Sequence, residues 1–352
     1  MNNLIKAAIV GATGYAGQEL VRLLLRHPDV ELVSIGSRSY DGQPMKDVYP
    51  LYEHITEDIC KNRTVEELSE ISDVIFLALP HGVASQEVNK DILDKCKIID
   101  LGADFRLKDL AIYKDWYKVD HGAQDLIEEA VYGLCELHRK EIKKARLIGN
   151  PGCYTTCSIL SLAPLVKNHL IEENSIIIDA KSGVTGAGRN GQLPYMFCEC
   201  TESVKPYKVG AHRHTPEIEQ ELSLLGNEEI KLIFTPNLVP MNRGISANCY
   251  ATLNDVGKQY TEEDLTTLYR DFYKDEYFIR ILESRIPDTK WVKGSNYCDL
   301  AVKVDQRTNR VIVIGAIDNL FKGAAGQAIQ NMNIMFDLPE KTGIDLITDY
   351  PV

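Results

Sequence analysis

The sequence predicts two successive parts of different architecture: a doubly wound α/β part with a parallel sheet, followed by an α+β part whose sheet is mostly antiparallel. Two observations support this division. Up to about residue 150, apolar runs of strand length alternate with stretches of helical periodicity. Beyond that point, strand-like runs follow one another with few helices between them.

The size, composition and charge of the chain narrow the class of protein. Its 352 residues can form two domains with substantial cores, and 44% apolar with 26% charged residues is typical of a globular protein. The formal net charge of −12 disfavours a nucleic-acid-binding or anionic-membrane-binding surface, because each needs a basic face. The sequence has no secretory apolar segment and no apolar run of membrane length, so we expect a cytoplasmic protein.

The nine cysteines are predicted to be free thiols. Their number is odd and no secretory signal accompanies them, so a disulfide framework is not expected. The closest pair, Cys198 and Cys200, has no nearby histidine pair or second cysteine pair that would complete a zinc site. We therefore expect no metal.

A glycine-rich turn in the first part predicts a dinucleotide-binding site. Strand-like residues 6–10 lead into Gly11-Ala-Thr-Gly-Tyr-Ala-Gly17, and a helical pattern follows over residues 19–26. Glycines let a pyrophosphate approach the backbone, and the helix N-terminus supplies N–H groups and positive potential. The spacing is G-x-x-G-x-x-G and not the commoner G-x-G-x-x-G, so a turn that only packs a strand on a helix is the alternative. The expected cofactor contacts in this turn are Gly11, Thr13, Gly14, Tyr15 and Gly17.

Residues after the next two predicted strands bear on the choice of cofactor. Strand 30–36 ends in Ser37 and Arg38, where NAD-binding sites usually carry an acidic residue for the ribose hydroxyls. An arginine beside hydroxyls suits the 2′-phosphate of NADP, although a plain surface arginine is the alternative. Strand 73–79 is followed by Pro80, at the sheet edge where open α/β sheets bind ligands; a turn without a ligand is the alternative there.

Several positions are candidates for binding an anionic substrate. Arg106 follows the strand 97–101 and can clamp a carboxylate or phosphate, or pair structurally with Asp104 or Asp100. In the second part, the stretch Lys181–Arg189 can wrap an anion with backbone N–H groups, with a flexible surface loop as the alternative. The candidates are Arg106, Ser182 and Gly183, followed by Arg189 and Arg243.

Cys153 is the candidate nucleophile. It follows Pro151 and Gly152, between a short apolar strand and a buried helical pattern over residues 157–166. In the first turn of a helix, unpaired N–H groups and the positive end of the macrodipole stabilise a thiolate. The alternative is a small packing residue, since free cysteine is among the most buried residue types.

Two histidines and a small-residue run supply further candidates. His212 and His214 precede a predicted helix with Thr215 as its N-cap and Pro216 as its first residue. Either histidine can serve a cysteine as proton acceptor and donor, or can simply be a capping or surface residue. The small-residue run over 318–330 is typical of a helix packed closely on another backbone. At its start, Asn319 and Gly323 can reach a ligand, or serve packing alone.

Five segments, taken together and in order, resemble N-acetyl-gamma-glutamyl-phosphate reductase over nearly the whole chain. They are Gly11–Gly17, Asn150–Tyr154, Lys181–Arg189, His212–Glu217 and Lys322–Gln327. Within the semialdehyde-dehydrogenase group, the third and fourth segments favour this family over aspartate-semialdehyde dehydrogenase. The family's cysteine motif usually has proline or a small apolar residue where Thr155 stands, and glycine or alanine where Cys157 stands. This chain therefore carries a second thiol one helical turn after Cys153.

The resemblance implies NADPH-dependent reductive dephosphorylation of N-acetyl-glutamyl 5-phosphate to the 5-semialdehyde, a step of arginine biosynthesis. It implies a thioester at Cys153 and a proton partner at His212, which when protonated would stabilise the oxyanion. His214 joins the substrate-binding candidates. The expected fold is an α/β Rossmann-type NADP-binding domain plus an α+β catalytic domain, in a homo-oligomer, either dimer or tetramer. The expected ranges are 1–150 for NADP binding, 151–318 for catalysis and oligomerisation, and 319–352 packed back on the first domain.

Three alternatives remain open at this stage. The first is the same chemistry on a related acyl phosphate, such as aminoadipyl or aspartyl phosphate. The second is a non-catalytic NADP-binding regulator, against which the presence of both Cys153 and His212 argues. The third is a thiol peroxidase or redox sensor that uses Cys153 and Cys157, for which the glycine-rich turn would have no purpose.

Overall fold

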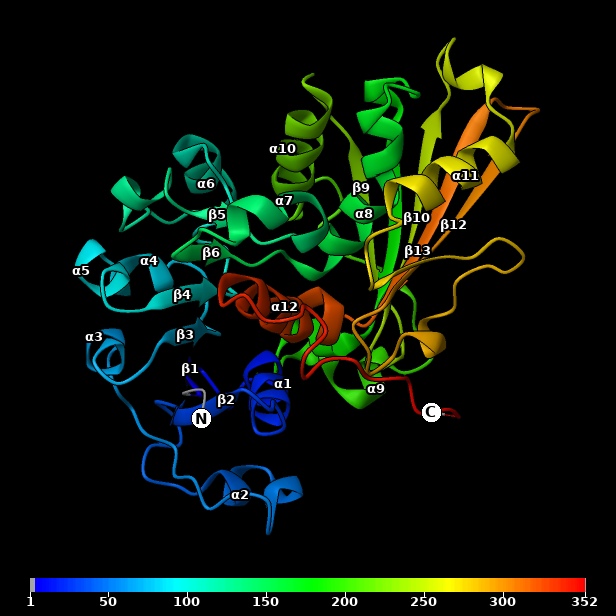
Figure 1. The fold of residues 1–352 in the computed structure, drawn as a ribbon. Helices are drawn as coiled ribbons and strands as arrows, with labels where there is room; N and C mark the ends of the chain where they lie inside the picture. Colours follow the sequence, from blue (N-terminus) through cyan, green and yellow to red (C-terminus); the bar gives the residue numbers. More distant parts are fainter. Residues whose placement is uncertain (1–3, 352) are drawn as a thin grey trace. The chain divides into compact units, whose positions relative to one another are not determined.

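A computed structural model of the chain describes residues 4–351, which form two compact units (Figure 1). The first unit comprises the described residues up to Pro151 together with Ala324–Asp345. The second comprises Gly152–Gly323 together with the described residues from Leu346 onward. Residues 319–323 and the final described residues thus lie in the second unit, whereas the sequence placed all of 319–352 with the first.

The first unit contains a parallel sheet with strand order β2-β1-β3-β4-β6-β5, and each of its strand pairs is parallel. Its strands are β1 (Ile5–Val10), β2 (Val30–Gly36), β3 (Val74–Leu77), β4 (Lys97–Asp100), β5 (Val131–Tyr132) and β6 (Leu147–Gly149). Strand β3 is buried along its whole length, which explains its continuous apolar sequence. The strand order reverses between β1 and β3, and ligands of doubly wound sheets bind at such a switch point.

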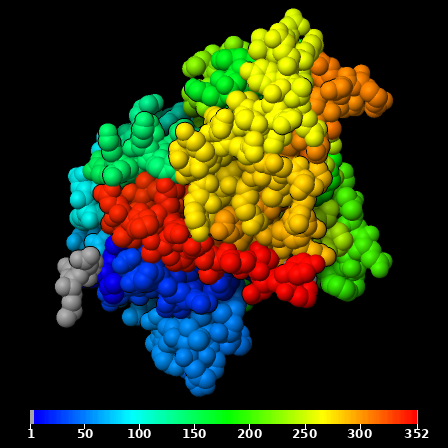
Figure 2. All heavy atoms as spheres, turned by 45° about the vertical axis from the view of Figure 1, so that its right-hand side comes forward, coloured from blue at the N-terminus to red at the C-terminus, as the bar shows by residue number. Residues whose placement is uncertain are grey.

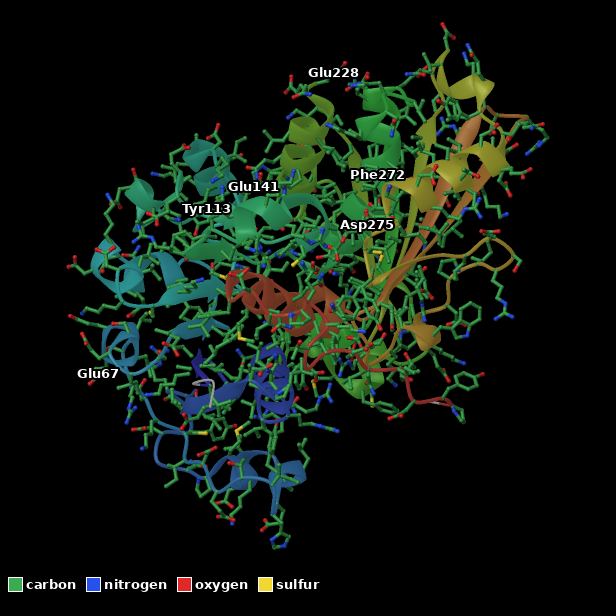
Figure 3. The ribbon with its side chains drawn as sticks, in the orientation of Figure 1. Glu67, Tyr113, Glu141, Glu228, Phe272 and Asp275 are labelled. Atoms are coloured by element: carbon green, nitrogen blue, oxygen red, sulfur yellow. The ribbon has the colours of Figure 1, made fainter. Side chains whose placement is uncertain are left out.

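Helices pack around this sheet. They are α1 (Tyr15–Leu24), α2 (Met45–Val48), α3 (Val65–Ser69), α4 (Ala84–Glu87), α5 (Lys90–Leu93), α6 (Leu110–Tyr117), α7 (Cys135–Ile142) and α12 (Gly326–Met335). The short helix α3 begins with a capping box, in which Thr64 and Glu67 each bond the other's backbone N–H. Figure 3 labels Tyr113 of α6, a buried tyrosine whose hydroxyl donates to Asp104 at 2.8 Å.

The helix α12 is added to the first unit from the far end of the chain. It packs against α7, β4 and α1, and its residues are all buried. Amide side chains hold it in place: Asn331 Nδ2 donates to the carbonyl oxygen of Gly133 at 2.8 Å, and Asn333 Oδ1 lies 3.0 Å from His27 Nε2. Hydrogen bonds with this directionality fix the register of the helix, which apolar packing alone would not.

The second unit contains a mixed sheet with strand order β11-β12-β13-β10-β7-β9-β8. Its strands are β7 (Ile177–Ser182), β8 (Lys205–Pro206), β9 (Ile233–Leu238), β10 (Ile245–Thr252), β11 (Ile279–Ile281), β12 (Cys298–Asp305) and β13 (Arg310–Ile317). The pairs β7–β9 and β11–β12 are parallel and the other pairs are antiparallel. The prediction of a mostly antiparallel sheet is confirmed.

A buried helix, α8 (Cys153–Lys167), packs on one face of this sheet. It contains Pro164, which has no N–H to donate to the carbonyl of Leu160 one turn earlier. The hydroxyl of Tyr273 donates to that carbonyl at 2.7 Å and so satisfies it. The other helices of the unit are α9 (Phe197–Cys200), α10 (Thr215–Gly226) and α11 (Glu262–Phe272), which Thr261 caps as predicted.

The opposite face of the sheet is partly exposed. Along β10, buried residues alternate with partly exposed ones such as Asn248 and Tyr250, and the same face of β13 carries Ile312 and Ile314. The segment that carries α9, drawn in green in Figure 2, also presents exposed apolar side chains, among them Phe197 at 78%. None of the helices within residues 4–351 is long and apolar enough to cross a lipid bilayer.

Candidate functional site

The first residue of α8 is Cys153 and Gly152 is its N-cap, which confirms the predicted place of the cysteine at a helix start. The first backbone hydrogen bond of the helix runs from Thr156 N–H to the carbonyl of Gly152, at 2.9 Å. The N–H groups before it point past the N-terminus, where they favour a thiolate. Cys153 is partly exposed, and the backbone of Gly323 lies against it: a Cβ at that glycine would be 2.7 Å from the Cβ of Cys153.

The second thiol of the helix, Cys157, has a different environment. It is fully buried under the sheet, and burial raises the pKa of its thiol well above the ordinary value, with Cys298 and Cys249 adding to the shift. A Cβ at Gly315 would lie 2.9 Å from its sulfur. Such a thiol is inert, because its thiolate is disfavoured and reagents cannot reach it.

A cluster of aromatic rings surrounds His212. Its ring centroid lies 4.7 Å from that of His214, 5.4 Å from that of Tyr207, 5.6 Å from that of Tyr154 and 5.2 Å from that of Phe234. The hydroxyl of Tyr207 donates to that of Tyr154 at 3.2 Å, and burial raises the pKa of both phenols. Neither tyrosine was expected to take part, although Tyr154 ends the segment Asn150–Tyr154 and Tyr207 lies five residues before His212.

His212 is neutral in this environment. Burial, and then the positive charges of His214, Lys208 and Arg213, lower its pKa to about 2, although Glu217 opposes them. The backbone N–H of His214 donates to Nδ1 of His212 at 3.1 Å, so the ring proton of the neutral form is on Nε2. The lowered pKa favours the neutral ring in the resting protein, and the role of a protonated His212 during the reaction stays a prediction.

The helix after the histidines starts one residue earlier than predicted. Thr215 is the first residue of α10, Pro216 the second, and His214 takes the N-cap position. The hydroxyl of Thr215 has no hydrogen-bond partner within the described part of the chain, so it does not cap the helix. Both histidines nevertheless precede the helix directly, as expected.

The stretch Lys181–Arg189 is not an anion-wrapping loop. Lys181 and Ser182 belong to β7, and the N–H groups of Gly183, Val184 and Thr185 all donate to backbone carbonyls of residues 241–244. A Cβ at Gly183 would lie 2.6 Å from the carbonyl oxygen of Asn242, so this glycine is required for close approach of two backbones. The prediction that these N–H groups wrap an anion is wrong, because they are already occupied.

Polar side chains of the second unit meet next to this stretch. The amide of Asn319 donates to the hydroxyl of Thr185 at 3.0 Å and accepts the N–H of Gly244 at 2.7 Å. A Cβ at Gly186 would be 3.5 Å from Ser182 Oγ and 3.7 Å from Asn319 Nδ2, so these two side chains face the same small space. The hydroxyl of Ser182 donates to the carbonyl oxygen of Gly183 at 3.0 Å and influences the pKa of Tyr154, so this space adjoins the aromatic cluster.

The two other arginine candidates of this unit are not equivalent. Arg243 is held by the fully buried Asp318, with Nε 2.9 Å from one carboxylate oxygen and Nη2 3.0 Å from the other. The same carboxylate accepts the N–H groups of Leu320 and Phe321. Arg243 thus supports the turn that carries Asn319. Arg189 is exposed beyond the 3-10 turn Val184–Ala187.

In the first unit, the three glycines of the glycine-rich turn have different surroundings: two are packed against backbone and one faces open space. Gly11 has φ +84°, and a Cβ there would lie 2.3 Å from the carbonyl oxygen of Ala78. A Cβ at Gly17 would lie 2.2 Å from the carbonyl oxygen of Gly11. A Cβ at Gly14, the N-cap of α1, would meet nothing closer than the carbonyl oxygen of Gly11 at 3.6 Å, so there is room for a ligand at the helix start beside Tyr15.

The residues expected to select the cofactor lie around this turn. The hydroxyls of Thr13 and Ser37 are 2.9 Å apart, which joins the turn to the end of β2. Arg38 is exposed and makes no ion pair with any described residue. Pro80 is exposed just after β3, at the carboxyl edge of the sheet. The residues present therefore fit a dinucleotide with an anionic group near Arg38.

Arg106 is buried and bonded to backbone. Its Nε donates to the carbonyl of Asn150 at 2.7 Å and its Nη2 to that of Leu101 at 2.9 Å. Burial, and then the neighbouring Asp104, raise the pKa of Asp100 to about 7. Oδ1 of Asp100 accepts the N–H of Gly102, while Oδ2 has no hydrogen-bond partner among the described residues. Arg106 thus holds the chain that leads into the cysteine segment.

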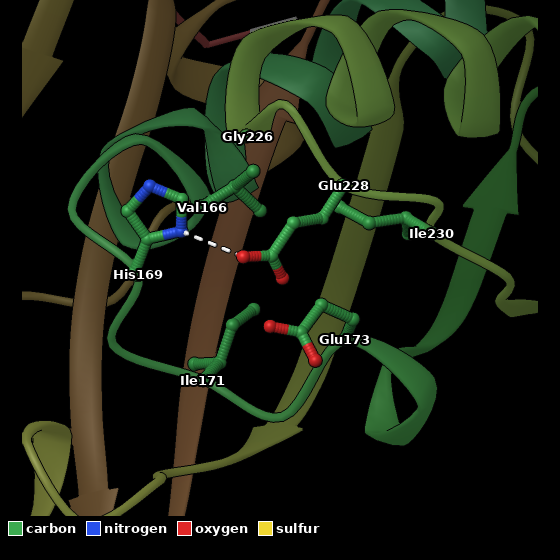
Figure 4. A pocket seen from close by; sticks show the side chains of 7 residues that line it. All are labelled: Val166, His169, Ile171, Glu173, Gly226, Glu228 and Ile230. Atoms are coloured by element: carbon green, nitrogen blue, oxygen red, sulfur yellow. Dashed lines mark ion pairs between the residues drawn. The ribbon is translucent and has the colours of Figure 1, made fainter.

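A small hollow in the second unit lies away from these groups (Figure 4). His169 Nδ1 is 3.6 Å from Glu228 Oε1 there, and a hydrogen bond with Glu173 raises the pKa of Glu228. None of the candidate site residues lines this hollow. Across residues 4–351, no three histidine, cysteine or acidic side chains are grouped as a metal ion would require.

Comparison with known proteins defines the class. A family model described as semialdehyde dehydrogenase, NAD binding domain, matches residues 6–145, and one described as semialdehyde dehydrogenase, dimerisation domain, matches residues 153–319. The fold is similar to that of aspartate semialdehyde dehydrogenase II of Vibrio cholerae, at 15% identity and a TM-score of 0.71 over 95% of this chain and 98% of that one. The Candida albicans enzyme with NADP gives 18% and 0.70, with the same coverage. The chain is an oxidoreductase of the semialdehyde-dehydrogenase class.

Relatives at higher identity define the family within this class. The N-acetyl-gamma-glutamyl-phosphate reductases of Lachnospira eligens and Lachnoclostridium phytofermentans are 53% and 51% identical, each over 99% of this chain and all of the relative. That of Campylobacter jejuni serotype O:6 is 53% identical over 97% of this chain and 98% of the relative. The chain belongs to the N-acetyl-gamma-glutamyl-phosphate reductase family, as the sequence motifs predicted.

Proposed function

We propose that this chain reduces N-acetyl-glutamyl 5-phosphate to the 5-semialdehyde with NADPH, through a thioester on Cys153, in arginine biosynthesis. The observation that carries the proposal is the thiol at the N-terminus of α8 in the same unit as a neutral imidazole held by two hydrogen-bonded tyrosines. An acyl phosphate has a reactive carbonyl and a good leaving group, and a thiolate is the side-chain nucleophile suited to it.

In the first step, Cys153 sulfur forms a bond to the acyl carbon and the bond from that carbon to the phosphate oxygen breaks. The helix N-terminus stabilises the thiolate, and the departing phosphate takes up the proton that the thiol has lost. Nε2–H of the neutral His212 donates a hydrogen bond to the acyl oxygen as negative charge develops on it. A neutral donor of this kind does not need to be protonated at working pH.

The nicotinamide cofactor, when bound, supplies the hydride that reduces the thioester. In this chain we propose that it contacts Gly11, Thr13, Gly14, Tyr15, Gly17, Ser37, Arg38 and Pro80, and the sequence motifs add Asn319 and Gly323 to these candidates. Arg38 favours NADPH over NADH, because its unpaired guanidinium is suited to a 2′-phosphate. After reduction, the carbon–sulfur bond breaks, the aldehyde leaves, and one proton from solvent restores the Cys153 thiol.

Ser182 is the side chain we propose for orienting the substrate, because it faces a small space beside Tyr154. Gly183 contributes by allowing the close approach of the segment 241–244. His214, Arg189 and Arg106 remain candidates for its charged groups. Arg243 acts indirectly, through Asp318 and the turn at Asn319.

We propose that the chain works as a homo-oligomer through its second unit. The matched dimerisation domain covers residues 153–319, and the partly exposed sheet face with Tyr250, Ile312 and Ile314 is suited to a second copy. We place the enzyme in the cytoplasm, because a catalytic thiol must remain reduced.

The alternatives make distinct predictions. Reduction of aspartyl or aminoadipyl phosphate would use the same thiol, and the relatives at 51–53% identity favour the glutamyl compound. A regulator without turnover would bind NADPH and leave the acyl phosphate intact. A redox sensor would need Cys157 to react, and this thiol is fully buried.

The decisive experiment runs the reaction backwards. Purified protein is mixed with N-acetylglutamate semialdehyde and NADP, with or without phosphate, and formation of NADPH is followed by its absorbance. We expect reduction only when phosphate or arsenate is present, since these release the acyl group from Cys153. Phosphate-independent reduction, or equal rates with aspartate semialdehyde, would contradict the proposal.

A further inference from the structure

Glu217 is a buried carboxylate to which the proposed chemistry assigns no role. It lies in the first turn of α10 and is fully buried. Its Oε1 accepts a hydrogen bond from the N–H of Gly152 at 2.9 Å and lies 2.9 Å from the hydroxyl of Thr155. Since Gly152 is the N-cap of α8, this carboxylate joins the start of the cysteine helix to the start of the helix that follows the histidines.

The two helix starts compensate for the burial of this charge. A buried carboxylate is unfavourable unless hydrogen bonds and positive potential replace its water. Both are present here, because Glu217 lies in the first turn of its own helix and bonds the N-cap residue of α8. The hydroxyl of Thr155 shares its proton between Glu217 and the carbonyl oxygen of Gly152, so it ties the carboxylate to the same N-cap residue.

The charge of Glu217 also reaches the histidine segment. Among the influences on His212, burial, His214, Lys208 and Arg213 all act against a positive charge on the ring, whereas Glu217 acts in its favour. Glu217 therefore balances the cations around His212 while it fixes the residue before the nucleophile. One side chain is linked to both catalytic candidates.

We infer that Glu217 is a positioning residue: it sets the cysteine helix against the histidine segment, so that Cys153 and His212 act on the same acyl group. This inference rests on the reaction proposed above. It requires that the charge of Glu217, as well as its shape, contributes to turnover. The variant Glu217→Gln keeps the size and one acceptor oxygen for the N–H of Gly152, and it replaces the charged carboxylate with a neutral amide.

The test compares Glu217→Gln with the unmodified full-length protein and with Glu221→Gln. Glu221 is a matched control, because it is a buried carboxylate one turn later on the same helix. For Glu217→Gln we expect kcat to fall about tenfold while KM for the acyl phosphate changes less than about threefold, since a charge-assisted bond is replaced by a neutral one. Glu221→Gln should retain turnover within about twofold, as expected away from the site.

A second measurement separates positioning from general damage. The rate of Cys153 alkylation by iodoacetamide reports on the thiolate alone, and removing a nearby negative charge should leave this rate unchanged or increase it. Slower turnover with an equally or more reactive thiol supports the inference. A parallel loss of turnover, alkylation and thermal stability would show a merely structural role and overturn it.

The outcomes also separate this inference from the function on which it rests. An active unmodified protein with a Glu217→Gln variant of normal kcat would overturn the role of Glu217 alone. An unmodified protein without acyl-phosphate reductase activity would overturn both. If the Gln variant is unstable, Glu217→Asp decides: it keeps the charge but shortens the reach, so an intermediate kcat supports positioning and a normal kcat overturns it.

Discussion

Asp100 gives the first unit a stability that depends on pH. The carboxyl is fully buried, and its pKa is raised from 3.8 to about 7, first by burial and then by Asp104. The folded state therefore binds the proton of Asp100 more tightly than the unfolded state does. The resulting stabilisation is fully present below the unfolded-state pKa of 3.8 and is lost as pH rises through the folded-state pKa of about 7. The shift of about three units corresponds to at most roughly 4 kcal/mol, of which about 2–3 kcal/mol is lost between pH 5 and pH 8.

The variant Asp100→Asn removes this titration. Asparagine resembles the neutral carboxyl and its Oδ1 can still accept the N–H of Gly102. We therefore expect the free energy of unfolding of the variant, relative to the unmodified protein, to rise by about 2–3 kcal/mol from pH 5 to pH 8. The measurement is urea unfolding followed by the fluorescence of Trp116 in a Trp291→Phe background, because Trp116 lies in the first unit.

Asp91→Asn is the control variant for Asp100→Asn. The exposed Asp91 belongs to the same unit, and Asp91→Asn removes one surface charge without opening a buried site. If the curves of free energy against pH for Asp100→Asn and the unmodified protein run parallel between pH 5 and pH 8, Asp100 does not titrate in that interval and the argument fails.

Four further outcomes follow from the site. Cys153→Ser should form no acyl-enzyme, whereas Cys157→Ala should still form it on Cys153 at a packing cost of about 1–2 kcal/mol, which mass spectrometry of protein trapped without NADPH and thermal unfolding will check. Arg38→Asp should weaken NADPH roughly ten- to a hundredfold and NADH far less, as measured by KM for each; equal losses would contradict the 2′-phosphate contact. Gly323→Ala should lower both kcat and stability, because the new Cβ would lie 2.7 Å from the Cβ and 3.1 Å from the Cα of Cys153; an unchanged alkylation rate at Cys153 would speak against this. The pKa of His212 is lowered to about 2, so His212 should not titrate near pH 6.5. Plots of kcat against pH for the unmodified protein and for His212→Gln should therefore have the same shape around pH 6.5.

Much of the fold was predictable because its signals are local. The apolar runs of β1, β3, β10 and β13, and the capped start of α11, can each be recognised within about ten residues of sequence. The short strands β5, β8 and β11 were missed. Segments of two or three residues become strands only through the neighbours with which they pair, and sequence periodicity does not report those neighbours.

In the candidate site, too, contacts between residues distant in sequence could not be predicted. Cys153 was placed correctly at its helix start, because proline and glycine mark that junction in the sequence. The N–H groups of Gly183 and Val184 were misjudged, because the carbonyls that occupy them lie some sixty residues further along. The lowered pKa of His212 could not be predicted for a related reason: Tyr154, Tyr207 and Phe234 come from separate elements, and only the fold brings them around the ring.

The place of α12 has a consequence for how the chain is made. Its amides complete the first unit by bonding to Gly133 and His27, yet they are synthesised some two hundred residues after Gly133. The strands of the parallel sheet are therefore synthesised long before α12, which packs on them. The whole of residues 152–323 is synthesised in between. Contacts this distant in sequence form slowly, so the nascent first unit should depend on chaperones until the chain is finished.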